Sequence, residues 1–113
     1  MCGISGFISD KSYVKKNNIN STLDLMSRRG PDAKNFYIEE NSSKQVGLLH
    51  TRLNIIDLND RSNQPFSKDQ IFYLLYNGEI YNLSKLRKII KSLDIHLTTT
   101  SDTEIIYELL VNI

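Results

Sequence analysis

The pattern of apolar and polar positions along the chain predicts short strands alternating with amphipathic helices. Residues 2–8, CGISGFI, predict a first β-strand, with Ile4 and Gly6 on one face and Gly3, Ser5 and Phe7 on the other. Residues 35–40 and 44–58 are rich in aromatic and β-branched side chains and flank a polar turn, so they predict two paired strands. Strands and helices in this mixture indicate an α+β fold.

A second pair of strands is expected around the dipeptide Asn77-Gly78. The apolar run 71–76 leads into this dipeptide and residues 79–83 follow it. Asn-Gly between apolar strands is the commonest sequence of a two-residue hairpin turn. The same dipeptide could also offer an amide side chain and an unobstructed backbone N–H to a developing oxyanion. The residues alone leave both interpretations open.

Helical spacing of apolar residues predicts three helices. Ser21 and Asp24 resemble a capping box for a helix over about 21–29, which should end where Gly30 suits a left-handed cap and Pro31 follows. A second helix is expected from Asn82, with one apolar face formed by Leu83, Leu86, Ile90 and Leu93.

The last predicted helix begins at a capping box. Ser101 and Glu104 form this box before the apolar run 105–113. Asp102 lies in its first turn, where a carboxylate suits the helix dipole without any function.

Composition restricts the classes of function. The chain has 113 residues, 40% of them apolar, with 14 basic and 13 acidic side chains and a net charge of +1. This indicates one globular domain and gives no basic field for a nucleic acid partner. Without a membrane-length apolar run or a signal peptide, a cytoplasmic location is the default expectation, with no membrane partner. The single cysteine and the widely separated His50 and His96 give no disulfide or metal-site pattern.

The single cysteine is Cys2, directly after the initiator Met1. Removal of Met1 would leave a thiol and a free α-amino group on one residue. An α-amino group has a pKa of about 7.7 to 8.0, so it can accept the thiol proton near neutral pH and create a nucleophile. Position 2 also holds small residues by chance, so this feature alone is a weak indication.

Arg52 is the second candidate, because it lies inside the apolar stretch LLHTRLNIID. A buried guanidinium needs a carboxylate partner or an exit to solvent, so Arg52 is either a clamp for a substrate carboxylate or a surface-directed strand residue. We expect His50 and His96 to be ordinary strand residues outside any mechanism.

Six short blocks occur in the order of a known family: MCGISGF at 1–7, RGPD at 29–32, HTRLNIIDL at 50–58, QPF at 64–66, NGEIYN at 77–82 and TSDTE at 100–104. Together they resemble the glutaminase domain of the class II glutamine amidotransferases, a cysteine branch of the N-terminal-nucleophile hydrolases. The nearest likeness is to the asparagine synthetase branch. One departure is Arg28, because family members often have a histidine before RGPD.

The resemblance implies a role for each matching residue. Cys2 would be the nucleophile, Asn77 and Gly78 the oxyanion hole, and Arg52 the partner of the glutamine α-carboxylate. Glu79 and Asp102 would receive the α-ammonium group, and the backbone of Leu53, Asn54, Ile55 and Ile56 would line the site. Glutamine would be hydrolysed to glutamate and ammonia through a glutamyl thioester, with no cofactor for this step and no metal.

The resemblance also implies an architecture. Residues 1–113 would be the N-terminal part of the glutaminase domain, an incomplete four-layer αββα sandwich of mostly antiparallel sheets that exposes sheet edges and apolar faces. The synthetase domain, which would use ATP and Mg and the ammonia to amidate aspartate, is absent, and the full-length enzyme could be a homodimer. Two alternatives stay open: a non-catalytic remnant that binds glutamine weakly or docks on a partner, and the glutaminase part of a relative that amidates another acid or sugar.

Overall fold

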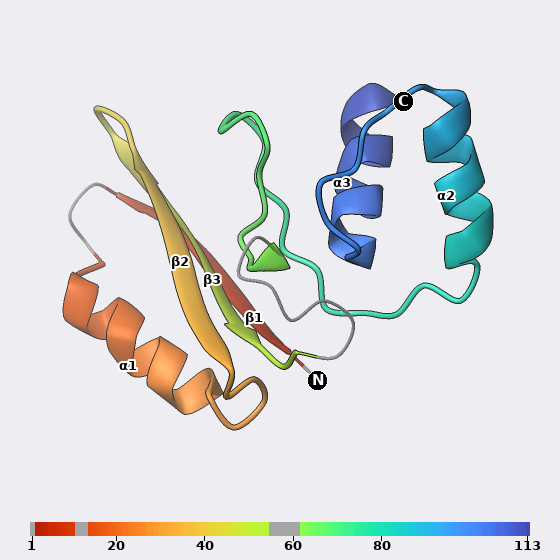
Figure 1. Ribbon diagram of the computed structural model, residues 1–113. Coiled ribbons are helices and arrows are strands. Elements are labelled where there is room, and N and C mark those ends of the chain that lie inside the picture. The colour runs from red at the N-terminus through yellow and green to blue at the C-terminus, as the bar shows by residue number, and fades with distance from the viewer. Residues whose placement is uncertain (1, 11–13, 55–61) are drawn as a thin grey trace.

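The computed structural model describes residues 2–10, 14–54 and 62–113, and it confirms an α+β fold (Figure 1). The elements follow in the order β1 (Gly3–Asp10), α1 (Lys16–Met26), β2 (Ala33–Glu40), β3 (Lys44–Arg52), α2 (Leu83–Ser92) and α3 (Asp102–Asn112). None of the helices in these ranges combines the length and the apolar character of a membrane span.

The three strands form one antiparallel sheet in the order β1-β3-β2, with β3 in the centre. Gly3 pairs with Thr51 at one end of the sheet, and Ala33 pairs with Arg52. Because β1 runs opposite to β3, the start of β1 lies beside the end of β3. This topology brings Cys2 next to the residues that follow Thr51.

Helix α1 covers one face of the sheet. Its buried residues Ile19 and Leu23 pack with Leu49 of β3, and the partly buried Phe7 and Ile38 surround this cluster. Phe7 belongs to the face of β1 that the alternating pattern assigned to Gly3, Ser5 and Phe7, so the predicted facing of β1 is confirmed.

The predicted start of α1 was wrong. The helix begins at Lys16 rather than near Ser21, and the preceding Lys15 provides no side-chain cap. Ile19, which is only 4% exposed, explains the earlier start, since burial of its side chain against the sheet requires helical structure before Ser21.

Gly30 does not form the left-handed cap that the sequence suggested, because its φ is not positive. A Cβ atom at this position would lie 2.4 Å from both the carbonyl carbon and the carbonyl oxygen of Thr51. Glycine is therefore required here for the close approach of two backbone segments. α1 ends at Met26, with Ser27 as its C-cap, about three residues before the predicted end near residue 29.

The sheet face opposite α1 exposes apolar side chains, as we expected of an incomplete sandwich. Ile4 is 47% exposed and Ile8 is 76% exposed, and both lie on this face of β1. Helices α2 and α3 pack against each other, and Figure 1 shows them on the far side of the sheet from α1. A four-layer sandwich is not present among the described residues.

The predicted hairpin around Asn77-Gly78 does not form. Between β3 and α2 the described residues contain an isolated β-bridge, Phe66 with Leu74, and no strand follows Gly78. The φ of Gly78 is not positive, whereas a type I′ turn requires positive φ at both central residues.

The predictions for the last two helices hold with one correction. Helix α2 follows Asn82 as predicted, although Ile90 is its one buried residue. Ser101 caps α3 by accepting a hydrogen bond from the N–H of Thr103. The reciprocal half of the predicted capping box is missing, because the carboxylate of Glu104 binds residues 98 and 99 instead.

Candidate active site

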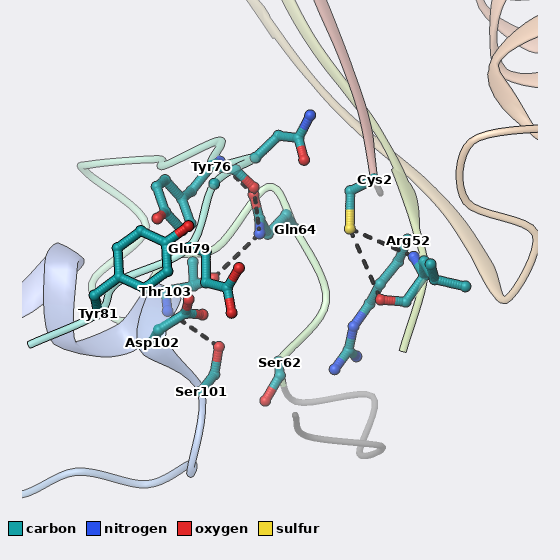
Figure 2. Close-up of a pocket in the computed structure, with 13 residues that line it drawn as sticks. Cys2, Arg52, Ser62, Gln64, Tyr76, Glu79, Tyr81, Ser101, Asp102 and Thr103 are labelled. Carbon is teal, nitrogen blue, oxygen red and sulfur yellow. Dashed lines mark hydrogen bonds between the residues drawn. The ribbon is translucent and has the colours of Figure 1, made fainter. Parts of the chain in front are cut away.

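One cavity of about 400 Å³ collects residues from five separate stretches of the chain (Figure 2). Most of the residues predicted for the site line it together. The complete lining is Cys2, Arg52, Leu53, Ser62, Gln64, Tyr76, Asn77, Gly78, Glu79, Tyr81, Ser101, Asp102 and Thr103.

Cys2 enters the cavity from the start of β1. The backbone N–H of Leu53 donates a hydrogen bond to its sulfur at 3.4 Å, and the thiol contacts the carbonyl oxygen of Leu53 at 3.8 Å. Nε of Arg29 donates to the carbonyl oxygen of Cys2 at 3.3 Å. The end of β3 and the RRGPD segment therefore fix both the thiol and the backbone of this residue.

Arg52 is the last residue of β3 and lies on the same side of the cavity as Cys2 (Figure 2). It is only 7% exposed, so the surface-directed alternative is wrong. One guanidinium nitrogen donates to Oδ1 of Asn63 at 2.7 Å, which directs the side chain along the cavity wall.

Two carboxylates lie across the cavity from Cys2 and Arg52. Figure 2 shows Glu79 and Asp102 close together there, and Tyr76 lines the same cavity. Burial raises the pKa of Tyr76, and the negative charges of Asp102 and Glu79 raise it further. The cavity thus has a cation on one wall and two anions on the other, which suits a ligand with charges of both signs.

Asn77 and Gly78 follow a residue whose backbone is held by a side chain. The N–H of Tyr76 donates to Oε1 of Gln64 at 2.5 Å, and Nε2 of Gln64 donates to the carbonyl oxygen of Tyr76 at 3.1 Å. These bonds occupy the groups of Tyr76 that a hairpin would use. A Cβ at Gly78 would lie 2.7 Å from the Tyr76 hydroxyl, so the packing favours glycine there.

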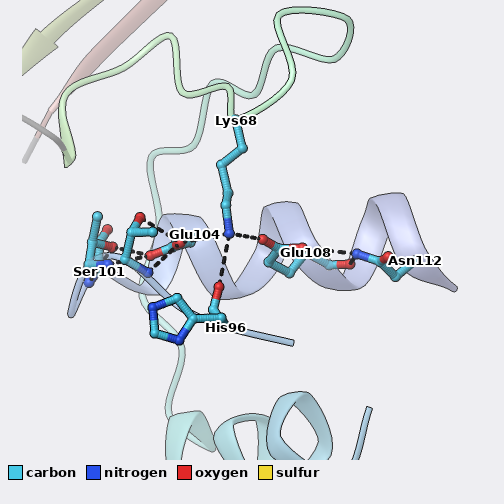
Figure 3. Close-up of polar contacts among 8 residues, drawn as sticks. Lys68, His96, Ser101, Glu104, Glu108 and Asn112 are labelled. Atoms are coloured by element: carbon cyan, nitrogen blue, oxygen red, sulfur yellow. Dashed lines mark hydrogen bonds and ion pairs between the residues drawn. The ribbon is translucent and has the colours of Figure 1, made fainter. Parts of the chain in front are cut away.

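The first turn of α3 is fixed by the carboxylate of Glu104, which is fully buried (Figure 3). The backbone N–H and hydroxyl groups of Thr98 and Thr99 donate to it at 2.6–2.9 Å. Burial alone would raise the pKa of Glu104, but the hydrogen bonds from Thr99 and Thr98 outweigh it and hold the pKa below its ordinary value. Glu104 is therefore a structural anion that secures the segment before Asp102.

Lys68 completes this polar cluster. Its ammonium group forms ion pairs with Glu104 at 3.2 Å and with Glu108, and it donates to the carbonyl oxygen of His96 at 3.0 Å (Figure 3). Burial would lower the pKa of Lys68, but the two carboxylates raise it above its ordinary value. The segment around Lys68 is thereby joined to α3 and to the loop at His96, which precedes α3.

The remaining predicted site residues do not belong to the described lining. The N–H of Asn54 donates to Oδ2 of Asp32 at 2.7 Å, and Asn54 is not part of the cavity wall. Ile55 and Ile56 lie outside the residues that the structure describes, and so does Met1.

The two histidines differ from each other. His50 is a buried strand residue, as expected, and neither of its ring nitrogens has a hydrogen-bond partner among the described residues. Burial lowers its pKa to about 4, and the positive charge of Arg52 adds to this effect. The prediction for His96 was wrong, because it lies in the loop between α2 and α3 and not in a strand.

Sequence reasoning assigned no role to several residues of the lining. Gln64 belongs to the QPF block that supports the family resemblance, but nothing in the block indicates what its amide contacts. Tyr76 and Thr103 flank predicted site residues directly, so their position next to Asn77 and Asp102 was the available signal.

Comparisons with known proteins identify the family of this chain. The glutamine amidotransferase domain family matches residues 1–113. The chain is 38% identical to the glutamine-hydrolysing asparagine synthetase of Brassica oleracea, over 96% of this chain and 18% of that protein. It is 33% identical to asparagine synthetase 3 of Bacillus subtilis, over 94% of this chain and 17% of that protein. It is 34% identical to amidase chry2 of Gibberella zeae, over 96% of this chain and 18% of that protein.

The chain spans less than a fifth of the length of each of these relatives. No solved structure gives a significant match to it. The family match nevertheless covers every residue, and the cavity gathers the residues on which the resemblance depends. The protein therefore belongs to the glutamine amidotransferase domain family and is related to the glutamine-hydrolysing asparagine synthetases.

Proposed function

We propose that this cavity binds glutamine and hydrolyses its side-chain amide. One observation carries the proposal: a thiol, a guanidinium and two carboxylates from distant parts of the chain share a cavity of about 400 Å³. Arg52 would bind the α-carboxylate of glutamine, and Glu79 and Asp102 would bind its α-ammonium group. The side-chain amide of the substrate would then reach Cys2.

The proposed reaction begins with Cys2 as the N-terminal residue. Its α-amino group takes the thiol proton, and the thiolate attacks the amide carbon of glutamine. The tetrahedral oxygen accepts hydrogen bonds from the Asn77 side chain and the Gly78 backbone N–H. The protonated amine gives its proton to the departing nitrogen, which leaves as ammonia. Water then hydrolyses the glutamyl thioester to glutamate and free thiol.

We further propose that residues 1–113 form the N-terminal part of a type-2 glutamine amidotransferase domain. In the full domain, a second sheet would cover the face that exposes Ile4 and Ile8 and complete a four-layer sandwich. The ammonia would serve ATP-dependent amidation of aspartate by a synthetase domain in a cytoplasmic enzyme, which could be a homodimer. A relative that amidates another acid or a sugar would use the same glutamine site.

A second candidate function is that of a non-catalytic remnant that binds glutamine weakly or docks on a partner. The exposure of Ile4 and Ile8 favours it, because an uncovered apolar face suits association more than rigid support of a catalytic site. The two candidate functions differ in one measurable property: the enzyme hydrolyses glutamine, and the remnant does not.

The test is the rate of glutamate formation from glutamine by the untagged chain. The proposal predicts glutamate production that Cys2→Ala abolishes, while glutamine binding measured by calorimetry persists. Asp10→Asn serves as a control, since the Asp10 side chain is 84% exposed and lies outside the cavity lining. Glutamate formation that is unchanged in Cys2→Ala would refute the proposed nucleophile. Binding of glutamine without any turnover by the wild-type chain would support the remnant.

A further inference from the structure

We propose that Gln64 is a positioning residue, whose side-chain amide holds the oxyanion donors and the N-terminus of α3 in one arrangement. This inference rests on the proposed glutamine hydrolysis. Gln64 is 6% exposed and lines the cavity, but its polar atoms bond to protein groups in the wall.

The geometry resembles a strand pair completed by a side chain. Phe66 and Leu74 exchange two backbone hydrogen bonds of 2.9 Å in an antiparallel bridge. The next hydrogen-bonded pair in such a ladder would be Gln64 with Tyr76. The amide of Gln64 supplies both bonds, since Oε1 accepts from the Tyr76 N–H and Nε2 donates to the Tyr76 carbonyl. Tyr76 is thereby fixed immediately before Asn77.

The same amide reaches a second element. Nε2 of Gln64 also donates to Oγ1 of Thr103 at 3.2 Å, between residues 39 positions apart in the chain. Thr103 is buried and directly follows Asp102 in the first turn of α3. One buried side chain therefore connects the segment proposed to stabilise the oxyanion with the segment proposed to bind the substrate ammonium group (Figure 2).

The two connections should affect different kinetic constants. Oxyanion donors act mainly in the transition state, so loss of the Tyr76 bonds should lower kcat. Asp102 would contact the bound substrate, so loss of the Thr103 bond should raise KM. If Gln64 were needed only for folding, its replacement would change only the fraction of active protein. The effects on kcat and KM would then not separate in this way.

The experiment compares three nearly isosteric substitutions in the full chain. Gln64→Met removes all three bonds, and Thr103→Val removes only the bond to α3. Gln45→Met is the matched control, because Gln45 is 5% exposed and its Nε2 donates to Glu40 on the sheet, outside the cavity lining. Kinetics of glutamate formation and hydrogen exchange of the amides in segments 75–80 and 100–104 are measured for each.

We expect Gln64→Met to lower kcat by about tenfold to a hundredfold, the effect expected of donors displaced by roughly 1 Å. Thr103→Val should raise KM severalfold with kcat within about twofold. Exchange should accelerate in both segments in Gln64→Met, in segment 100–104 in Thr103→Val, and in neither segment in Gln45→Met.

Unchanged exchange in Gln64→Met would overturn the inferred connection. Faster exchange with unchanged kcat and KM would overturn the positioning role while leaving glutamine hydrolysis intact. A wild-type chain that shows no hydrolysis would instead overturn the proposed function, together with the catalytic role that rests on it.

Discussion

Lowering the pH from about 7 to about 4 should destabilise the fold through His50. The residue is 0% exposed, and within the part of the chain that the structure describes both ring nitrogens lack hydrogen-bond partners. Burial, with a further contribution from the charge of Arg52, lowers its pKa from 6.5 to about 4. The unfolded chain therefore binds a proton at a higher pH than the folded chain. Between these two pKa values unfolding takes up a proton, so acid favours the unfolded state.

The size of the effect follows from the two pKa values. The difference between 6.5 and about 4 corresponds to about 3 kcal/mol of unfolding free energy, at roughly 1.4 kcal/mol per pH unit. This is a large share of the roughly 5–15 kcal/mol that stabilises an ordinary domain. The contribution is fully present above pH 6.5 and is lost as the pH falls toward 4.

Urea unfolding at a series of pH values measures this loss directly. His50→Phe keeps a ring of similar size and removes both nitrogens, so its stability should fall by about 3 kcal/mol less than that of the wild type over the same range. His96→Phe provides the control, because His96 is an exposed loop residue. Parallel stability curves for wild type and His50→Phe would refute the reasoning. They would mean that the pKa of His50 is the same in the folded and the unfolded chain.

Two further predictions concern the supports of the site. Gly30→Ala should cost about 3 kcal/mol of unfolding free energy, because its Cβ would lie 2.4 Å from the Thr51 carbonyl, whereas Gly6→Ala, with its nearest contact at 3.0 Å, should cost less. Equal urea midpoints for these two variants would contradict this. Glu104→Gln should also cost about 3 kcal/mol at neutral pH, because it disrupts a buried carboxylate network. The difference should shrink below the ordinary pKa of 4.5, where the wild type loses the stabilisation of its carboxylate. Asp10→Asn, in an ion pair whose carboxylate is 84% exposed, should show no measurable loss, and a loss as large as that of Glu104→Gln would contradict the assignment.

Local sequence patterns predicted the three strands of the sheet and the approximate helices, because side-chain periodicity reports directly which face is buried. They failed at the start of α1, where packing of Ile19 on the sheet extends the helix beyond its best capping sequence. They failed again at Gly30, because the backbone that approaches it comes from β3, distant in the chain. In both cases a tertiary contact decided the outcome.

Asn77-Gly78 shows the same limit at the candidate site. Turn propensity favours a hairpin, whereas in the structure the amide of Gln64 occupies the backbone groups of Tyr76 that a hairpin would pair. The grouping of Cys2, Arg52 and Asp102 could be expected only from the resemblance to a family, since no local pattern relates residues this far apart. Their common cavity results from the antiparallel pairing of β1 with β3 and from the position of α3.

The central claim is that Cys2 is an N-terminal nucleophile in a glutamine-binding cavity. Its most direct test is the intact mass of the untagged chain before and after treatment with a diazo ketone analogue of glutamine, with free glutamine as competitor. The account predicts loss of Met1 and a single adduct on Cys2 that glutamine suppresses. Retention of Met1, or labelling that does not respond to glutamine, would contradict it.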